Sequence, residues 1–119
     1  MGATVNAICR CGLNSEIRIG GGMSTFTYLC YFPCLCENCN DIVEVNLYDM
    51  HPQCPNCRGE NLIPYDDKQV IAIEGDHNIV SWNANEKVDR ELILTNGTYM
   101  CPKCKKMTLR FIGPILRWD

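Results

Sequence analysis

Polar and apolar residues alternate along several short stretches of the chain, which is the pattern of half-buried β-strands. The alternation is clearest in residues 16–20 and 42–48, and in the second stretch Val43, Val45 and Leu47 share one face. We expect that face to pack inward, because successive side chains of a strand point to opposite sides. The pattern therefore predicts a small all-β chain.

Further strands are expected where β-branched and aromatic residues gather. The stretch 25–32 is the richest of these, and Pro33 is expected to end it. Asn96-Gly97 predicts a type I′ hairpin between residues 92–95 and 98–100, because both turn residues tolerate a positive φ. The shorter strands are predicted at 4–8, 61–65, 69–73, 78–82 and 107–112, the last one ending at Gly113-Pro114.

The cysteine content is several times ordinary usage, with ten cysteines in 119 residues. Either metal ions or disulfides are therefore expected to hold the fold together. The N-terminus has neither the basic nor the apolar segment of a signal peptide, and no apolar run has the length of a membrane span. We expect a cytoplasmic chain without a membrane segment, in a reducing compartment where paired cysteines bind metal more often than they form disulfides.

Two C-x2-C pairs lie at 36–39 and 54–57, with fourteen residues between them. Four thiolates at this spacing suit a tetrahedral zinc ion. Asn40 and Gly59, just beyond the two pairs, are residue types that tolerate the positive φ of such a turn. The pattern predicts a first metal site, called site 1, with the ligands Cys36, Cys39, Cys54 and Cys57.

A third C-x2-C pair, at 101–104, needs a partner, and the C-x-C-G at 9–12 is the remaining candidate. We expect a second site, called site 2, with the ligands Cys9, Cys11, Cys101 and Cys104, and with site 1 nested inside it along the chain. An interleaved pairing, of 9/11 with 36/39 and of 54/57 with 101/104, is the alternative that the sequence leaves open. Cys30 is expected in the core, whereas Cys34 could replace Cys36 as a ligand.

The four cysteines of site 1 and the strands around them resemble the zinc-ribbon family over residues 25–65. The resemblance implies a zinc-ribbon-like all-β fold, in which antiparallel hairpins are stapled by two metal sites of four cysteines each, with two Zn²⁺ ions per chain. We expect a single domain, 1–119, in which residues 66–91 form a β excursion. The outer site is expected where residues 1–20 meet residues 92–119.

Other cysteine chemistries fit the pattern less well. Dithiol oxidoreductases need a helix after the C-x2-C motif to lower the thiol pKa, whereas extended stretches follow 54–57 and 101–104. Rubredoxin-like iron sites typically have glycine directly after each second cysteine, where Asn40, Arg58 and Lys105 stand here. Since the chain offers no nucleophile with its base and no paired carboxylates, we expect a non-catalytic module; an iron or redox protein remains an alternative.

The charge is divided unevenly along the chain, whose net charge is −3. Residues 36–100 carry twelve acidic and four basic side chains, a net of −8, while residues 101–119 carry five basic and one acidic, a net of +4. An acidic body repels phosphate backbones, so we expect a protein partner, contacted by 66–91 with an exposed Trp82. The alternative is nucleic-acid binding of the transcription and translation type, through a basic and aromatic strand with Lys103, Lys105, Lys106, Arg110 and Trp118.

Overall fold

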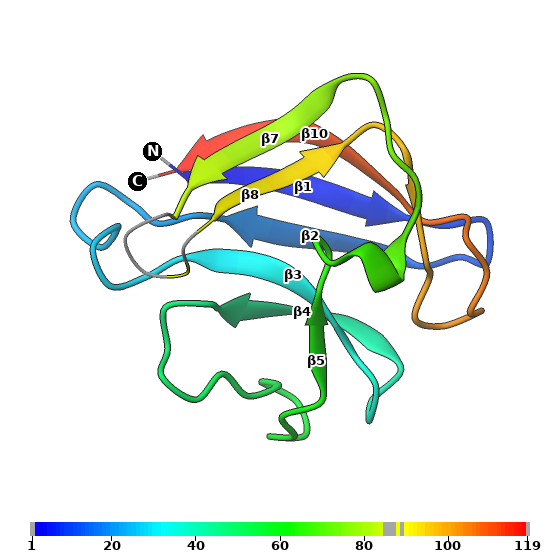
Figure 1. Cartoon of the computed structure of the whole chain (residues 1–119), viewed down its shortest axis with the longest axis horizontal. Helices are drawn as coiled ribbons and strands as arrows, with labels where there is room; N and C mark the ends of the chain where they lie inside the picture. The colour runs from blue at the N-terminus through cyan, green and yellow to red at the C-terminus, as the bar shows by residue number, and fades with distance from the viewer. Residues whose placement is uncertain (1, 85–87, 89, 119) are drawn as a thin grey trace.

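The computed structural model describes residues 2–84, 88 and 90–118, the last three of them as backbone only. Within these residues the chain forms antiparallel β-strands and a short 3-10 turn, η1 (Lys68–Val70) (Figure 1). The strands are β1 (Gly2–Ile8), β2 (Asn14–Ile19), β3 (Tyr31–Cys36), β4 (Asp41–Asn46), β5 (Leu62–Pro64), β6 (Ile71–Ile73), β7 (Asn78–Asn83), β8 (Glu91–Thr95), β9 (Thr98–Tyr99) and β10 (Arg110–Trp118). The expected small all-β, zinc-ribbon-like fold is confirmed.

The strands form two three-stranded sheets, β10-β1-β2 and β4-β3-β5, and two pairs, β6-β9 and β7-β8. In Figure 1 the β7-β8 pair lies in front of the first sheet, and β3, β4 and β5 lie below it. The guanidinium of Arg18, on β2, donates to the Glu44 carboxylate, on β4, at 2.7 and 3.0 Å, and its backbone N–H donates to the same group at 2.8 Å. These contacts join the two larger sheets.

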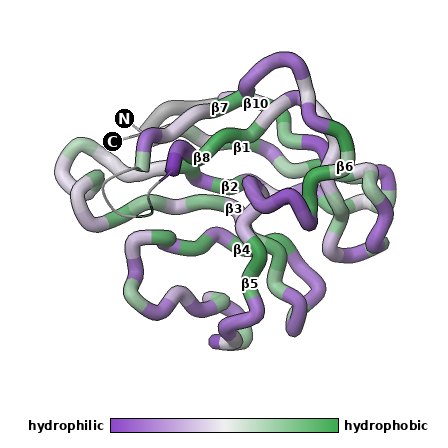
Figure 2. The backbone as a smooth tube through the Cα atoms, in the orientation of Figure 1, coloured by the Kyte–Doolittle hydropathy of each residue, from purple (hydrophilic) through white to green (hydrophobic). Residues whose placement is uncertain are grey.

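The main hydrophobic core lies between the sheets and includes three aromatic rings that meet edge to face. Tyr65, Tyr99 and Phe111 have ring centroids 5.0–5.9 Å apart. Val70 and Ala84, from the stretch 66–91, are also buried in this core. Figure 2 shows hydrophobic residues along several strands, and hydrophilic residues in the loop between β6 and β7 and in the loop between β4 and β5. The stretch expected as an excursion is therefore packed against the rest of the chain.

A much smaller core lies under site 1. Its buried members are three cysteines and two valines, namely Cys34, Cys36, Val43, Val45 and Cys54. The expected inward face of 42–48 is present, since Val43 and Val45 point into this cluster. Ile42 is buried too, on the opposite side in the main core, because β4 is covered on both faces. This cluster therefore contains few apolar side chains.

The strand expected at 25–32 is wrong. Residues 23–28 form turns, because the Thr25 hydroxyl accepts the N–H of Gly22 at 2.9 Å and the N–H of Phe26 donates to the Gly22 carbonyl at 2.9 Å. Such side-chain bonds to nearby backbone compete with strand formation. The strand begins at Tyr31 instead and passes through Pro33, whose carbonyl accepts the N–H of Tyr65 just beyond the end of β5. Pro33 is tolerated because β5 pairs only with residues from Cys34 onward.

The prediction of a type I′ hairpin at Asn96-Gly97 is wrong as well. The strand β8 pairs with β7, and β9 pairs with β6, so the two residues connect separate sheets. Neither residue has a positive φ. The Asn96 side chain accepts the N–H of His77 at 3.2 Å, and a Cβ on Gly97 would overlap the carbonyl oxygen of Ile73. Packing against the 73–77 segment determines the conformation of these two residues, and their local turn preference does not.

The expected end of the last strand at Gly113-Pro114 is also wrong. The strand β10 runs from Arg110 to Trp118 and pairs with β1 on both sides of these two residues. The register with β1 shifts between Thr4 and Asn6, so the irregular segment is absorbed as a bulge. A proline at a bulge removes no ladder hydrogen bond, and the strand continues.

Candidate metal centres

The turns that carry the cysteine pairs bring eight sulfurs together as two groups of four. In site 1 the end of β3 supplies Cys36, the turn after it supplies Cys39, and the loop before β5 supplies Cys54 and Cys57. Site 2 joins the β1–β2 turn to the segment between β9 and β10, at the right of Figure 1, and its cysteines are Cys9, Cys11, Cys101 and Cys104. This is the nested arrangement; the interleaved alternative is not the one in the structure.

The spacing of the sulfurs fits a tetrahedral metal ion. In site 1 the Sγ–Sγ distances are 3.7 Å for Cys36–Cys57 and 3.7 Å for Cys39–Cys54. In site 2 the Cys9–Cys104 distance is 3.7 Å and the Cys11–Cys101 distance is 3.6 Å. A tetrahedron with metal–sulfur bonds of about 2.3 Å has edges of about 3.8 Å. Each group therefore has the size of a tetrathiolate cage, and both can hold a metal ion.

The three C-x2-C turns share one backbone conformation. The residue after each second cysteine has a left-handed φ, of 52° at Asn40, 61° at Arg58 and 63° at Lys105. The N–H of each donates to the carbonyl of the first cysteine at 2.8–3.0 Å. Gly12 takes this role after the shorter C-x-C pair, with a φ of 103°. At the second pair the sequence pointed to Gly59, which is wrong, because the left-handed residue is Arg58.

Backbone donors in site 1 point at the sulfurs. The N–H groups of Cys39, Asn56 and Gly59 each lie 3.4 Å from a ligand sulfur. The Gly59 N–H lowers the pKa of Cys57 to about 7, since a hydrogen bond to a thiolate favours that form. A hydrogen bond with the neighbouring Cys57 sulfur raises the pKa of Cys39 to about 12, because it favours the protonated thiol of Cys39. A cation bound among the four sulfurs would favour the thiolate form of all of them.

Site 2 has a side-chain hydroxyl beside its sulfurs. The Oγ1 atom of Thr108 lies 3.1 Å from the Cys9 sulfur and 4.0 Å from that of Cys104. Burial by itself raises the pKa of Cys9, but the backbone of Cys11 and the Thr108 hydroxyl hydrogen-bond to the thiolate and lower it to about 6. No pattern in the sequence marked Thr108, because the segment that carries it, between β9 and β10, meets the Cys9 turn only in the folded chain.

Cys30 and Cys34 lie outside both groups. Their side chains are fully buried, and burial raises the pKa of each to about 12. The Cys34 thiol points toward the Phe32 carbonyl at 3.8 Å, and the sulfur that this strand contributes to the site 1 group is that of Cys36. Both cysteines are therefore neutral core residues at neutral pH, as was expected for Cys30.

The residues that the sequence predicted to contact a partner differ in their exposure to solvent. Lys103, Lys105, Lys106 and Arg110 are exposed, whereas the side chain of Trp118 lies outside the described residues. The Lys105 ammonium donates to the Asn40 side chain at 2.7 Å, and that of Lys103 lies 3.7 Å from the Asp41 carboxylate. Trp82 is not exposed as expected: it is half-buried against the main core, and a Cβ on Gly20 would overlap its ring.

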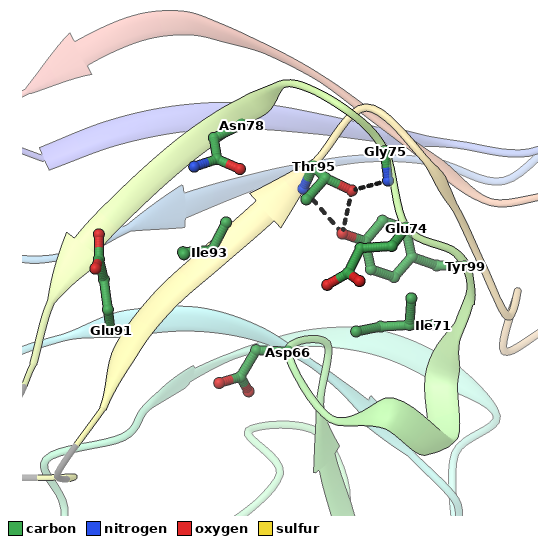
Figure 3. A pocket seen from close by; sticks show the side chains of 9 residues that line it. All are labelled: Asp66, Ile71, Glu74, Gly75, Asn78, Glu91, Ile93, Thr95 and Tyr99. Carbon is green, nitrogen blue, oxygen red and sulfur yellow. Dashed lines mark hydrogen bonds between the residues drawn. The ribbon is translucent and has the colours of Figure 1, made fainter.

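A pocket of about 410 Å³ lies apart from both cysteine groups, between the 66–78 segment and β8 (Figure 3). It is lined by the carboxylates of Asp66, Glu74 and Glu91, over Ile93 and the ring of Tyr99. Asp66 is paired with Arg90, and Glu91 accepts a hydrogen bond from Ser81. The three carboxylates do not converge on one point, since the groups of described residues close enough to hold a metal are the two cysteine clusters.

The fold and the two clusters define a small all-β, zinc-ribbon-like protein with two four-cysteine groups that can bind metal ions. Compared with known proteins, the chain matches no family model, no curated protein and no solved structure. Among the described residues, no helix has the length and apolar character needed to cross a membrane.

Proposed function

We propose that this chain is a non-catalytic module of the zinc-ribbon family in which two zinc ions have a structural role. The observation that carries the proposal is that each cluster supplies four cysteine sulfurs. A zinc site with four protein ligands is closed, whereas a catalytic zinc keeps a position open for water or substrate. The strands that follow the C-x2-C pairs support the same conclusion, because a dithiol redox site needs a helix at that place.

The small size of the core under site 1 supports a structural role for a metal ion there. The cluster under site 1 has two valines and three cysteines as its buried members, two of them ligands. Burial of so few side chains offsets little of the conformational entropy lost on folding. Zinc binding supplies the difference, because the free energy of binding to a site that forms only on folding is folding free energy.

The partner that we propose is a protein, and the loop 22–29 is the surface that favours it. Met23, Phe26 and Tyr28 are exposed on this loop, with 65%, 43% and 61% of their surface accessible. The chain has no charged residue from Ile19 to Cys36. Hydrogen bonds from Phe26 to Gly22 and from Leu29 to Thr25 hold the loop in shape. Ordered, uncharged aromatic side chains are typical of protein interfaces.

Nucleic-acid binding has less support. Two of the lysines expected to contact phosphates, Lys103 and Lys105, are engaged with Asp41 and Asn40 instead. Phosphate binding would have to displace these contacts and overcome the net charge of −8 on residues 36–100. The half-buried position of Trp82 removes it as an interface anchor, so the expected contact surface moves from 66–91 to the loop.

A pair of variants separates the two partner classes. In zinc-loaded protein, F26A/Y28A should weaken binding to a protein partner identified by cross-linking by at least ~2 kcal/mol, since exposed anchor side chains cost ~1 kcal/mol or more each when truncated. The variant I73A truncates another exposed side chain, 67% accessible, and is the matched control. The triple variant K103Q/K105Q/K106Q should leave this affinity almost unchanged. Binding of single- or double-stranded nucleic acid that survives physiological salt and is lost in the lysine variant would contradict the proposal.

A further inference from the structure

A side-chain hydrogen bond links the two candidate metal centres. It joins the two residues that close the turns of these sites. Asn40 closes the first turn of site 1 and Lys105 closes the second turn of site 2, each by donating its backbone N–H to the first cysteine of its pair. The Lys105 ammonium donates to the Asn40 side-chain oxygen at 2.7 Å, across 65 positions of the sequence. A shift of either turn therefore moves a hydrogen-bonding partner of the other turn.

A second polar contact lies beside the first. Lys103 stands between the two cysteines of the site 2 turn, and its ammonium lies 3.7 Å from the Asp41 carboxylate. Asp41 begins β4 and pairs with the ligand Cys36. A zinc ion with four thiolates carries a net charge of −2, so both lysines lie where they offset the repulsion between two loaded centres.

A buried contact links the same two parts of the chain. The hydroxyl of Tyr65, which directly follows β5, donates to the carbonyl of Met100 at 2.9 Å, and Met100 directly precedes the ligand Cys101. The Tyr65 side chain is fully buried, and its backbone N–H donates to Pro33 of β3. Its ring packs edge to face against Tyr99 and Phe111. The approach to Cys101 is thus fixed to the sheet that carries site 1.

We propose that the two zinc centres are energetically coupled, so that metal bound at one site raises the metal affinity of the other through the Tyr65–Met100 and Lys105–Asn40 contacts. The first ion orders the turns of its own site. These contacts then restrict the turns of the second site, which binds its ion at a smaller cost in conformational entropy. The coupling is reciprocal, because binding free energies obey linkage. The inference rests on the proposed structural zinc.

The coupling is measured as the ratio of three zinc-binding constants obtained with the full chain in competition with a chromophoric chelator. The constant for loading both sites is divided by the product of the single-site constants of C101S/C104S, which keeps site 1, and C36S/C39S, which keeps site 2. We expect a ratio of about ten or more, the usual size of coupling between sites. In the background Y65F/K105M the ratio should fall toward one.

A matched control tests the route of the coupling. Tyr99 also has a buried hydroxyl, but it is bonded to Thr95, and Lys106 is an exposed neighbour of Lys105. The variant Y99F/K106M should therefore keep the wild-type ratio. A wild-type ratio of one overturns the coupling, and an equal fall in both double variants overturns the assigned contacts. A chain that takes up no zinc would instead overturn the structural-zinc proposal itself, so the two failures are distinguishable.

A second measurement keeps the inference testable if a serine variant does not fold. Native mass spectrometry at one zinc ion per chain reports the fractions with zero, one and two ions. Y65F/K105M should show a larger singly loaded fraction than the wild type, because weaker coupling favours intermediates. Y99F/K106M should match the wild type. An unchanged fraction in Y65F/K105M overturns the inference.

Discussion

Removal of zinc from this chain should unfold it, and loss of one ligand should cost the metal of one site. We expect a strong chelator to abolish the near-ultraviolet circular dichroism, and added zinc to restore it. Structural zinc contributes on the order of 10 kcal/mol to folding in small metal-dependent domains, which is comparable with the whole stability of an ordinary domain, about 5–15 kcal/mol. The variant Cys54→Ser should hold one ion in place of two, because it removes a ligand of site 1.

The two cysteines outside the clusters give the control for this result. Cys30→Ala and Cys34→Ala remove buried sulfurs that are not ligands, so both variants should keep two ions and lose only the packing of one side-chain atom, about 1 kcal/mol. Metal content by elemental analysis and the urea midpoint report the two effects separately. A Cys34→Ala chain with one ion would contradict the assignment of ligands at site 1.

Gly97→Ala should destabilise the zinc-loaded chain by ~3 kcal/mol or more, an effect of the size that overpacking a closed contact produces. A Cβ at this position would overlap the carbonyl oxygen of Ile73 and approach the backbone nitrogen of Gly75. Both obstacles are main-chain atoms, so no side chain can turn aside. The strands β6 and β9 would have to separate, and β9 leads directly into the Cys101 turn.

Gly12→Ala is the matched control for Gly97→Ala. Gly12 has a left-handed φ of 103°, but a Cβ there would have no atom within 4 Å. Its cost should be backbone strain alone, about 1–2 kcal/mol. Urea unfolding of both variants with zinc present compares the two costs. Equal stabilities for Gly97→Ala and the wild type would show that the backbone at Gly97 does not lie this close to the Ile73 carbonyl.

The cysteine pairs could be predicted from the sequence because the two cysteines of each pair are joined by a short covalent segment. A C-x2-C segment brings two sulfurs within reach of one ion whatever surrounds it, and the fourteen-residue separation leaves room for one strand and its return. The small all-β fold followed from the alternation in 42–48 and from the β-branched stretches. What the sequence left open was the pairing of the turns, because pairing depends on how distant strands meet.

The failed expectations have two physical causes. Tertiary contacts overrode local preferences at Asn96-Gly97 and Trp82, whereas hydrogen bonds within local turns decided the conformation of 25–32 and of Arg58. Asn96-Gly97 has the composition of a hairpin turn, yet its hydrogen bonds go to the 73–77 segment. Arg58 adopts a left-handed conformation that its side chain disfavours, because the turn at Cys54–Cys57 requires it there and not at Gly59. Trp82 lies on β7 and covers Gly20, a contact that no pattern along the chain reveals.

The protein-partner proposal and the coupling proposal both depend on the metal centres, so the metal itself is the central claim. The most direct test is elemental analysis of the purified chain combined with X-ray absorption at the zinc edge. The account predicts two zinc ions per chain, each with four sulfur neighbours at about 2.3 Å. One metal ion per chain, iron in place of zinc, or nitrogen and oxygen neighbours in the absorption spectrum would contradict it.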